Sequence, residues 1–189
     1  MLHIRILVLE DSIEDAELII RELDKSEKII IDEWKRVETE AEFVQFLNHD
    51  RTWDVILVDA KLPQMSALRA LELLKATDLD TPMVLVTGTF SVEAAYVLAE
   101  RGMNGWMLKE FLWLLPAVIA QVIRESRLRM ETRRLERELE ALRSPLQNIC
   151  SLIKLYAQLL AHGKEDRLED YAVILMQQIE RLENLIYKA

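Results

Sequence analysis

The sequence predicts an α/β protein: a five-stranded parallel sheet of order 2-1-3-4-5, doubly wound by helices, followed by a C-terminal helical hairpin that forms a dimeric four-helix bundle. Over residues 1–123, short apolar runs alternate with segments whose apolar residues recur at helical spacing. Over residues 124–189, apolar residues step along the chain by four and three. Four Gly and four Pro among 189 residues are too few for the many turns of an all-β sandwich.

Five short apolar runs predict the strands: Ile4–Leu9, Ile29–Val37, Val55–Val58, Met83–Val86 and Trp106–Leu108. Near-continuous apolar strands are typical of a parallel sheet that helices cover on both faces. In such a sheet the functional residues collect at the C-terminal ends of the strands.

The segments between these runs predict helices at Ile13–Leu23, Thr39–Leu47, Ser66–Ala76 and Val92–Arg101, with a further helix beginning near Phe111. In the first of them, apolar residues recur from Ile13 to Leu23 at a spacing of three or four, which is one face of an α-helix. The alternation of strand and helix therefore persists to about residue 123.

The last third of the chain carries a heptad seam. Its members are Leu128, Thr132, Leu135, Leu139, Leu142, Leu146, Ile149, Ile153, Tyr156 and Leu160, with only Thr132 polar. His162-Gly163 ends this helix, and a second one carries Leu168, Tyr171, Leu175, Ile179, Leu182 and Ile186. A lone hairpin cannot bury both stripes, whereas two hairpins can, so we expect a homodimer through residues 124–189. The alternative is a hairpin that folds back on its own α/β domain.

We expect two domains, 1–123 and 124–189, without a break between them. Residues 111–161 then form one long helix that bends where Pro145 removes a backbone donor. Charge divides along the same line, since residues 1–123 carry 12 Lys+Arg and 22 Asp+Glu (net −10), and residues 124–189 carry 12 and 11 (net +1).

Composition also narrows the class of protein. An overall net charge of −9 disfavours non-specific binding to nucleic acid or anionic membrane. The longest apolar stretch, Leu112–Ile123, is too short to span a bilayer. Cys150 is the one cysteine, so no internal disulfide forms, and we expect a cytoplasmic protein.

Polar residues follow four of the predicted strands. Glu10 and Asp11 follow the first, Asp59 the third, Thr87 the fourth and Lys109 the fifth. Three converging carboxylates would repel one another without a cation, and hard oxygen ligands favour Mg²⁺. A lysine and a threonine hydroxyl nearby could bind phosphoryl oxygens. Each residue has a plainer explanation, such as Asp11 as a helix N-cap, but their joint placement predicts a phosphoryl-transfer site.

Residues 1–123 resemble the receiver domain of two-component response regulators. The matching stretches are ILVLEDS, WDVILVDAKLP, PMVLVTG and GWMLKE. The resemblance implies that Asp59 is phosphorylated and that Mg²⁺ binds Glu10, Asp11, Asp59 and the backbone carbonyl of Lys61. It also implies that Thr87 and Lys109 contact the phosphoryl group, and that Trp106 occupies the position of the rotating aromatic switch.

Several positions depart from that family's pattern. Glu110 follows Lys109 where the family usually has a proline in a cis bond, and a cis bond without proline costs about 2.5–4 kcal/mol, which favours a trans bond here. Ala67 stands where the family often has glycine. Lys61 places a cation at the mouth of the site, and Trp106 is larger than the usual switch residue.

The hairpin resembles the dimerisation and histidine-phosphotransfer domain of sensor kinases, through EALRSPLQNI, SLIKLYAQLL and IERLENLI. Aligning the Leu-Arg-Ser-Pro-Leu core places Glu140 where that family has its phosphorylated histidine. Glutamate cannot form a phosphoramidate, so we expect a degenerate module without kinase activity. Glu140 is then either a surface glutamate or an electrostatic mimic of phosphohistidine.

These features predict a response regulator that is not an enzyme. A histidine kinase donates a phosphoryl group to Asp59, and the change passes through the dimeric hairpin to a protein partner. One alternative is an RNA-binding regulator, since arginines crowd residues 124–137, although glutamates interleave with them. Another is a receiver that serves only as a phosphate sink or relay.

Overall fold

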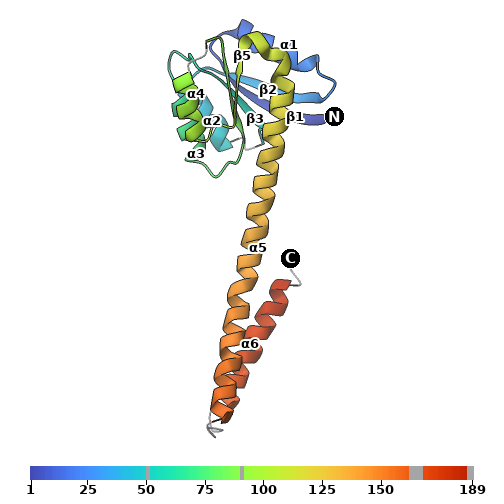
Figure 1. Ribbon diagram of the computed structural model, residues 1–189, viewed down its shortest axis with the longest axis vertical. Coiled ribbons are helices and arrows are strands. Elements are labelled where there is room, and N and C mark those ends of the chain that lie inside the picture. The colour runs from blue at the N-terminus through green and yellow to red at the C-terminus, as the bar shows by residue number, and fades with distance from the viewer. Residues whose placement is uncertain (50–51, 90–91, 162–167, 187–189) are drawn as a thin grey trace. The chain divides into compact units, whose positions relative to one another are not determined.

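The computed structural model describes residues 1–49, 52–89, 92–161 and 168–186. The chain divides into two compact units, Met1–Arg129 and Met130–Ala189. Figure 1 labels the helices and strands of both units.

The first unit contains the predicted five-stranded parallel sheet. Its strands are β1 (Leu2–Leu9), β2 (Ile29–Val37), β3 (Val55–Asp59), β4 (Met83–Thr87) and β5 (Gly105–Leu108). Their order is β2-β1-β3-β4-β5, which confirms the order expected from the sequence. β3 and β4 each end one residue later than predicted, because Asp59 still pairs with Val86 and Thr87 with Leu108.

Six helical segments accompany this sheet along the chain. They are α1 (Ile13–Asp24), α2 (Glu40–His49), α3 (Ala67–Lys75), α4 (Val92–Glu100), the 3₁₀ helix η1 (Lys109–Leu114) and the start of α5 (Leu115–Ala161). Figure 1 shows α1 and α5 on one side of the sheet and α2, α3 and α4 on the other. This is the doubly wound arrangement that the strand pattern predicts.

Strand β1 shows why both faces are covered. Ile4, Ile6 and Val8 are buried in a cluster with side chains of α1 and α5. Leu7 and Leu9 point to the opposite face and are buried with side chains of α2 and α3. Because successive residues of a strand face opposite sides, a continuous apolar run can only be buried between two helical layers.

Short polar side chains start two of the helices. Ser12 precedes α1, and its hydroxyl oxygen accepts a hydrogen bond from the Asp15 N–H (3.1 Å). Ser66 precedes α3 and accepts from the Arg69 N–H (3.1 Å) in the same way. The helix predicted at Ser66–Ala76 therefore begins one residue later, because its first residue is the N-cap. Ser12, and not Asp11, caps α1.

The connection from β5 to α5 differs from the helix predicted to begin near Phe111. η1 occupies Lys109–Leu114, and Phe111 has non-helical dihedral angles (φ −116°, ψ 28°), so α5 begins only at Leu115. No cis peptide bond occurs among the described residues, and the Lys109–Glu110 bond is trans. α5 then continues through Pro145 to Ala161; the bend expected at Pro145 stays a prediction.

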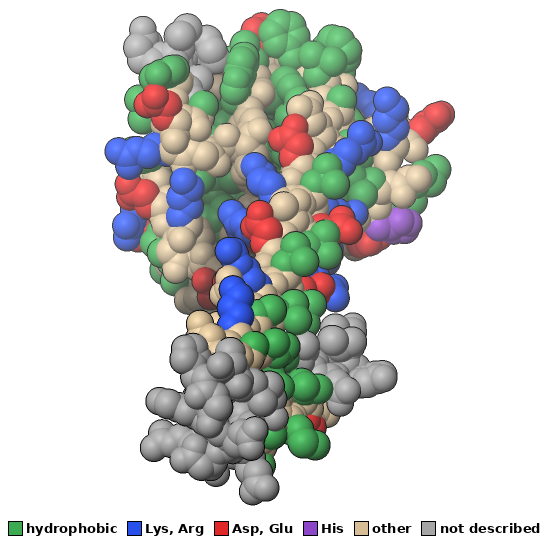
Figure 2. Space-filling view, turned by 60° about the horizontal axis from the view of Figure 1, so that its bottom comes forward, with side chains coloured by type: hydrophobic (Ala, Val, Ile, Leu, Met, Phe, Trp, Pro, Cys, Tyr) green, Lys and Arg blue, Asp and Glu red, His purple; other side chains and the backbone are tan. Residues whose placement is uncertain are grey.

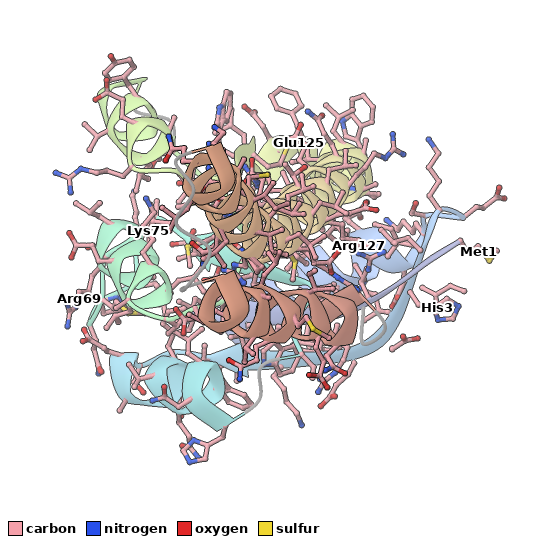
Figure 3. The ribbon with its side chains drawn as sticks, turned by 90° about the horizontal axis from the view of Figure 1, so that it is seen from below. Met1, His3, Arg69, Lys75, Glu125 and Arg127 are labelled. Carbon is pink, nitrogen blue, oxygen red and sulfur yellow. The ribbon has the colours of Figure 1, made fainter. Side chains whose placement is uncertain are left out.

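Polar contacts attach α5 to the segments that precede β3 and β4, at the amino-terminal ends of these strands. The Ser126 hydroxyl is buried and donates to the carbonyl oxygen of Asp80 (2.5 Å). Arg127, labelled in Figure 3, pairs with Asp54 just before β3 (3.0 Å). These contacts extend the hydrophobic attachment of α5 through its first three turns.

The second unit contains the rest of α5 and α6 (Leu168–Ile186), which lie alongside each other (Figure 1). Several members of the predicted seam are exposed, among them Leu135 (53%), Leu139 (67%) and Ile153 (51%). Of the other predicted features, the His162-Gly163 turn and the side chains of Tyr156, Leu160, Leu168, Tyr171, Leu182 and Ile186 lie outside the described residues. No described helix is long and apolar enough to cross a membrane.

Packing of α5 against the sheet predicts a large effect of truncating its buried face. Ile119 is fully buried among α1, β1 and β5 side chains. We expect Ile119→Ala to lower the free energy of unfolding by about 2–5 kcal/mol, because it leaves a cavity in the core. Urea denaturation measures this, with Arg124→Ala on the exposed side of the same helix as control. An equal loss in both variants would contradict the assigned packing.

Candidate functional site

The residues predicted to form the site come together at the carboxyl edge of the sheet. Glu10 directly follows β1, Asp59 ends β3, Thr87 ends β4 and Lys109 directly follows β5. Leu9, Val58 and Val86, which precede the first three, are buried, and Met107 is buried two residues before Lys109, so the strands fix where these polar side chains emerge. The parallel pairing of β1, β3, β4 and β5 places all these ends on one side.

Three carboxylates form the centre of this cluster. One oxygen each of Glu10, Asp11 and Asp59 lies within 4.8 Å of the others. Glu10 (2% exposed) and Asp59 (7% exposed) are buried, whereas Asp11 is exposed. The arrangement offers hard oxygen ligands with one side open to solvent, which suits a divalent cation that keeps several waters.

Lys109 lies against the same carboxylates. Its Nζ donates to Glu10 Oε2 (2.8 Å) and to Asp15 Oδ2 (2.5 Å), and it forms an ion pair with Asp59 Oδ1 (3.2 Å). The lysine side chain is only 18% exposed. A single ammonium group therefore compensates charge on three carboxylates from three different elements.

Burial and pairing shift the pKa values of two groups. Burial raises the pKa of Glu10, although the hydrogen bond and charge of Lys109 oppose this shift. Burial alone would lower the pKa of Lys109, but hydrogen bonds to Asp15 and Glu10 and the charge of Asp59 outweigh it and raise that pKa. The pairing therefore favours the charged form of Lys109, and Lys109 is the neighbour that opposes the effect of burial on the pKa of Glu10.

The second oxygen of Asp59 is bound by the backbone. Asp59 Oδ2 accepts a hydrogen bond from the Lys61 N–H (2.7 Å). The Lys61 side chain is exposed, as expected for a cation at the mouth of the site. Binding of a metal by the Lys61 carbonyl stays a prediction.

Thr87 is buried at the end of β4, and its hydroxyl is engaged with the following loop. It donates to the Thr89 carbonyl oxygen (2.9 Å) and accepts from the Thr89 N–H (3.3 Å). A phosphoryl oxygen on Asp59 would have to replace Thr89 as the acceptor of the Thr87 hydroxyl.

Two predicted positions remain, one in each unit. Trp106 is 48% exposed in β5 and lines a surface pocket of about 320 Å³ with Met103, Val118 and Gln121. Glu140 belongs to the second unit, where it is exposed and lies 3.8 Å from Arg143 Nη1. Their roles as aromatic switch and phosphohistidine mimic stay predictions.

Two residues at the site were not predicted from the sequence. Asp15 binds Lys109, and Arg36 Nη1 at the end of β2 donates to the backbone carbonyls of Glu10 (2.9 Å) and Asp11 (3.2 Å). Ser12 and Asp15 form the S-x-x-D spacing of a helix start, which could have placed Asp15 in the first turn of α1 beside the acidic pair. Nothing in the sequence around Arg36 distinguishes it from a surface arginine.

Comparison with known proteins agrees with this geometry. The family described as the response regulator receiver domain matches residues 6–113. The chain belongs to this family. Its first unit is therefore the receiver domain of a two-component system, which confirms the resemblance found in the sequence. No curated protein sequence matches the chain.

Solved receiver structures share the fold. The signal receiver domain of a putative LuxO repressor protein from Vibrio parahaemolyticus is 25% identical, covers 69% of this chain and 98% of its own, and gives a TM-score of 0.60. The receiver domain of the histidine kinase CKI1 from Arabidopsis thaliana, complexed with Mg²⁺ and BeF₃⁻, is 21% identical. It covers 63% of this chain and 89% of its own, and gives a TM-score of 0.53. The degenerate kinase-like hairpin is not confirmed and stays a prediction.

Because Lys109 contacts three carboxylates, we expect that a divalent cation can partly replace its charge when the lysine is removed. We expect Lys109→Met to lower the free energy of unfolding by about 1–3 kcal/mol without divalent cation, because buried carboxylates lose their countercharge. Millimolar MgCl₂ should raise the melting temperature of this variant more than that of the wild type. Differential scanning calorimetry measures both, with the exposed Lys75→Met as control. An unchanged response to MgCl₂ would contradict the shared site.

Proposed function

We propose that this chain is a response regulator whose Asp59 accepts a phosphoryl group from the phosphohistidine of a partner histidine kinase. The observation that carries this is the environment of Asp59. Its buried carboxylate is bound on one oxygen by the Lys61 N–H (2.7 Å) and on the other by Lys109 (3.2 Å), with Glu10 and Asp11 beside it. Burial and charged partners raise the pKa values of Glu10 and Lys109 beside it, and such perturbed groups cluster at functional sites.

Mg²⁺ is the proposed cofactor, held by Glu10, Asp11, Asp59 and the Lys61 carbonyl. The residues fit it, because three hard oxygens lie within 4.8 Å and the cluster carries more negative charge than Lys109 alone compensates. When bound, the metal neutralises charge on the phosphoryl oxygens. The complex of CKI1 with Mg²⁺ and BeF₃⁻ supports this choice in a protein of the same fold.

In the proposed reaction an oxygen of Asp59 attacks the phosphorus atom. The new O–P bond replaces the N–P bond of the donor, and the imidazole leaves with the electron pair of that bond. Lys109 supplies an N–H to a phosphoryl oxygen, and the Lys61 N–H holds Asp59 in position. These residues act by positioning and charge compensation, which dominate phosphoryl transfer.

The phosphoryl group then changes the loop after β4. The Thr87 hydroxyl leaves the Thr89 carbonyl to donate to a phosphoryl oxygen, and this frees the loop to move. Trp106, half-exposed beside a pocket, is the proposed second switch residue. Phosphorylation shifts the population of conformations because these contacts exist in one state only.

We further propose a cytoplasmic regulator that has no kinase activity, with a receiver over residues 1–123 and an output domain over 124–189. Two output domains associate into a four-helix bundle and bind a protein partner. The support is the exposed leucine seam of α5 in the second unit. Figure 2 shows hydrophobic side chains along this helix, with acidic and basic side chains alternating above them. Such mixed charge favours helix pairing over nucleic-acid binding.

Phosphorylation at Asp59 is tested by intact-mass spectrometry after incubation with acetyl phosphate and MgCl₂. We expect one phosphoryl group on the wild type and none on Asp59→Asn, because the amide is not a nucleophile. Asp78→Asn, an exposed aspartate away from the site, is the matched control and should be modified normally. Modification of Asp59→Asn at wild-type level would refute the assignment.

Assembly is tested by light scattering of the full chain. We expect the molar mass of two 22.1 kDa chains for the wild type. The double variant Leu139→Asn and Leu146→Asn should be a monomer, because it places amides in the apolar seam. Arg137→Asn on the same helix should leave the dimer intact. A monomeric wild type, with and without beryllofluoride and Mg²⁺, would rule out the four-helix bundle.

A further inference from the structure

The ammonium group of Lys109 donates to two carboxylates and forms an ion pair with a third. A lysine carries three N–H groups. The hydrogen bonds are to Asp15 (2.5 Å) and Glu10 (2.8 Å), and the ion pair is with Asp59 (3.2 Å). A phosphoryl oxygen on Asp59 therefore has to share the ammonium with two carboxylates that already hold it more closely.

Asp15 differs from the other two partners. It belongs to α1, it is 41% exposed, and it lies outside the cluster of three carboxylates that could hold a metal. Its backbone is fixed, because its N–H donates to the Ser12 hydroxyl at the helix N-cap (3.1 Å). The carboxylate closest to Lys109 thus lies at the exposed rim of the carboxylate cluster, on a residue whose backbone is held by the helix N-cap.

We infer that Asp15 is a positioning residue that draws the Lys109 ammonium toward the rim and away from Asp59. This inference rests on the proposed role of Asp59 and extends it. With the ammonium shared, Glu10 and Asp59 are less fully neutralised, so a divalent cation meets less competition for them. A phosphoryl group, in contrast, has to compete with Asp15 for the same ammonium. Asp15 therefore favours the metal and disfavours the phosphoryl group.

Opposite signs of these two effects make the inference testable. We expect Asp15→Asn to weaken Mg²⁺ binding about three- to fivefold in a calorimetric titration, the size of a partly exposed charge pair. At saturating Mg²⁺, the same variant should bind beryllofluoride about three- to fivefold more tightly in a ¹⁹F NMR titration. Asp15→Glu, which restores the carboxylate, should return both affinities close to those of the wild type.

Glu14→Gln is the matched control. Glu14 is exposed, neighbours Asp15 in the first turn of α1, and contacts the Ser12 hydroxyl (3.2 Å). Its substitution removes the same charge from nearly the same place. If Glu14→Gln reproduces both changes in affinity, they result from the loss of any negative charge near the site, and the inference is wrong. If Asp15→Asn weakens both ligands, Asp15 is only structural and the inference is also wrong.

The two proposals fail in different ways. If the wild type does not bind beryllofluoride, or if Asp59→Asn binds it equally well, the proposed phosphorylation site is wrong. In that case the Mg²⁺ titrations alone still decide whether Asp15 controls the position of Lys109. If the wild type binds beryllofluoride and Asp15→Asn matches it in both titrations, only the inference about Asp15 is overturned.

Discussion

The site depends on one lysine that compensates several carboxylates. Glu10 and Asp59 are buried at the end of an apolar sheet, where an unpaired charge is costly. Lys109, which follows the edge strand β5, contacts both of them and Asp15 as well. β5, η1 and α1 must therefore keep their places for these charges to stay paired.

Hydrophobic packing holds that arrangement in place. β1, β3 and β4, which deliver three of the four strand-end residues, are buried on both faces over their last four residues, so they cannot slide without exposing a whole layer of side chains. α5 is attached to this core by Leu115, Ile119 and the buried Ser126 hydroxyl. The end of β5 is therefore followed directly by η1 and by the helix that continues into the second unit.

Much of the receiver could be predicted because its information is local. Five apolar runs mark the strands, and helical spacing marks the segments between them. The predictions were wrong only at the ends of helices and strands. Ser66 is an N-cap and not the first helical residue, and η1 replaces the predicted first turn near Phe111. Capping and 3₁₀ geometry depend on backbone angles that periodicity does not contain. The heptad seam of α5 was also visible in the sequence, and its leucines are exposed in the structure, so the homodimer stays a prediction.

The sheet, the resemblance to receiver domains and the polar residues at the strand ends could all be predicted from the sequence. This was possible because strand ends in a parallel sheet converge whatever the details of packing. The partners that these residues take became apparent only in the folded chain. Asp15 lies 94 positions from Lys109 and Arg36 lies 26 from Glu10, and such contacts arise from the folding of separate elements against one another. The three-way sharing of the Lys109 ammonium is therefore a property of the fold, and no local pattern encodes it.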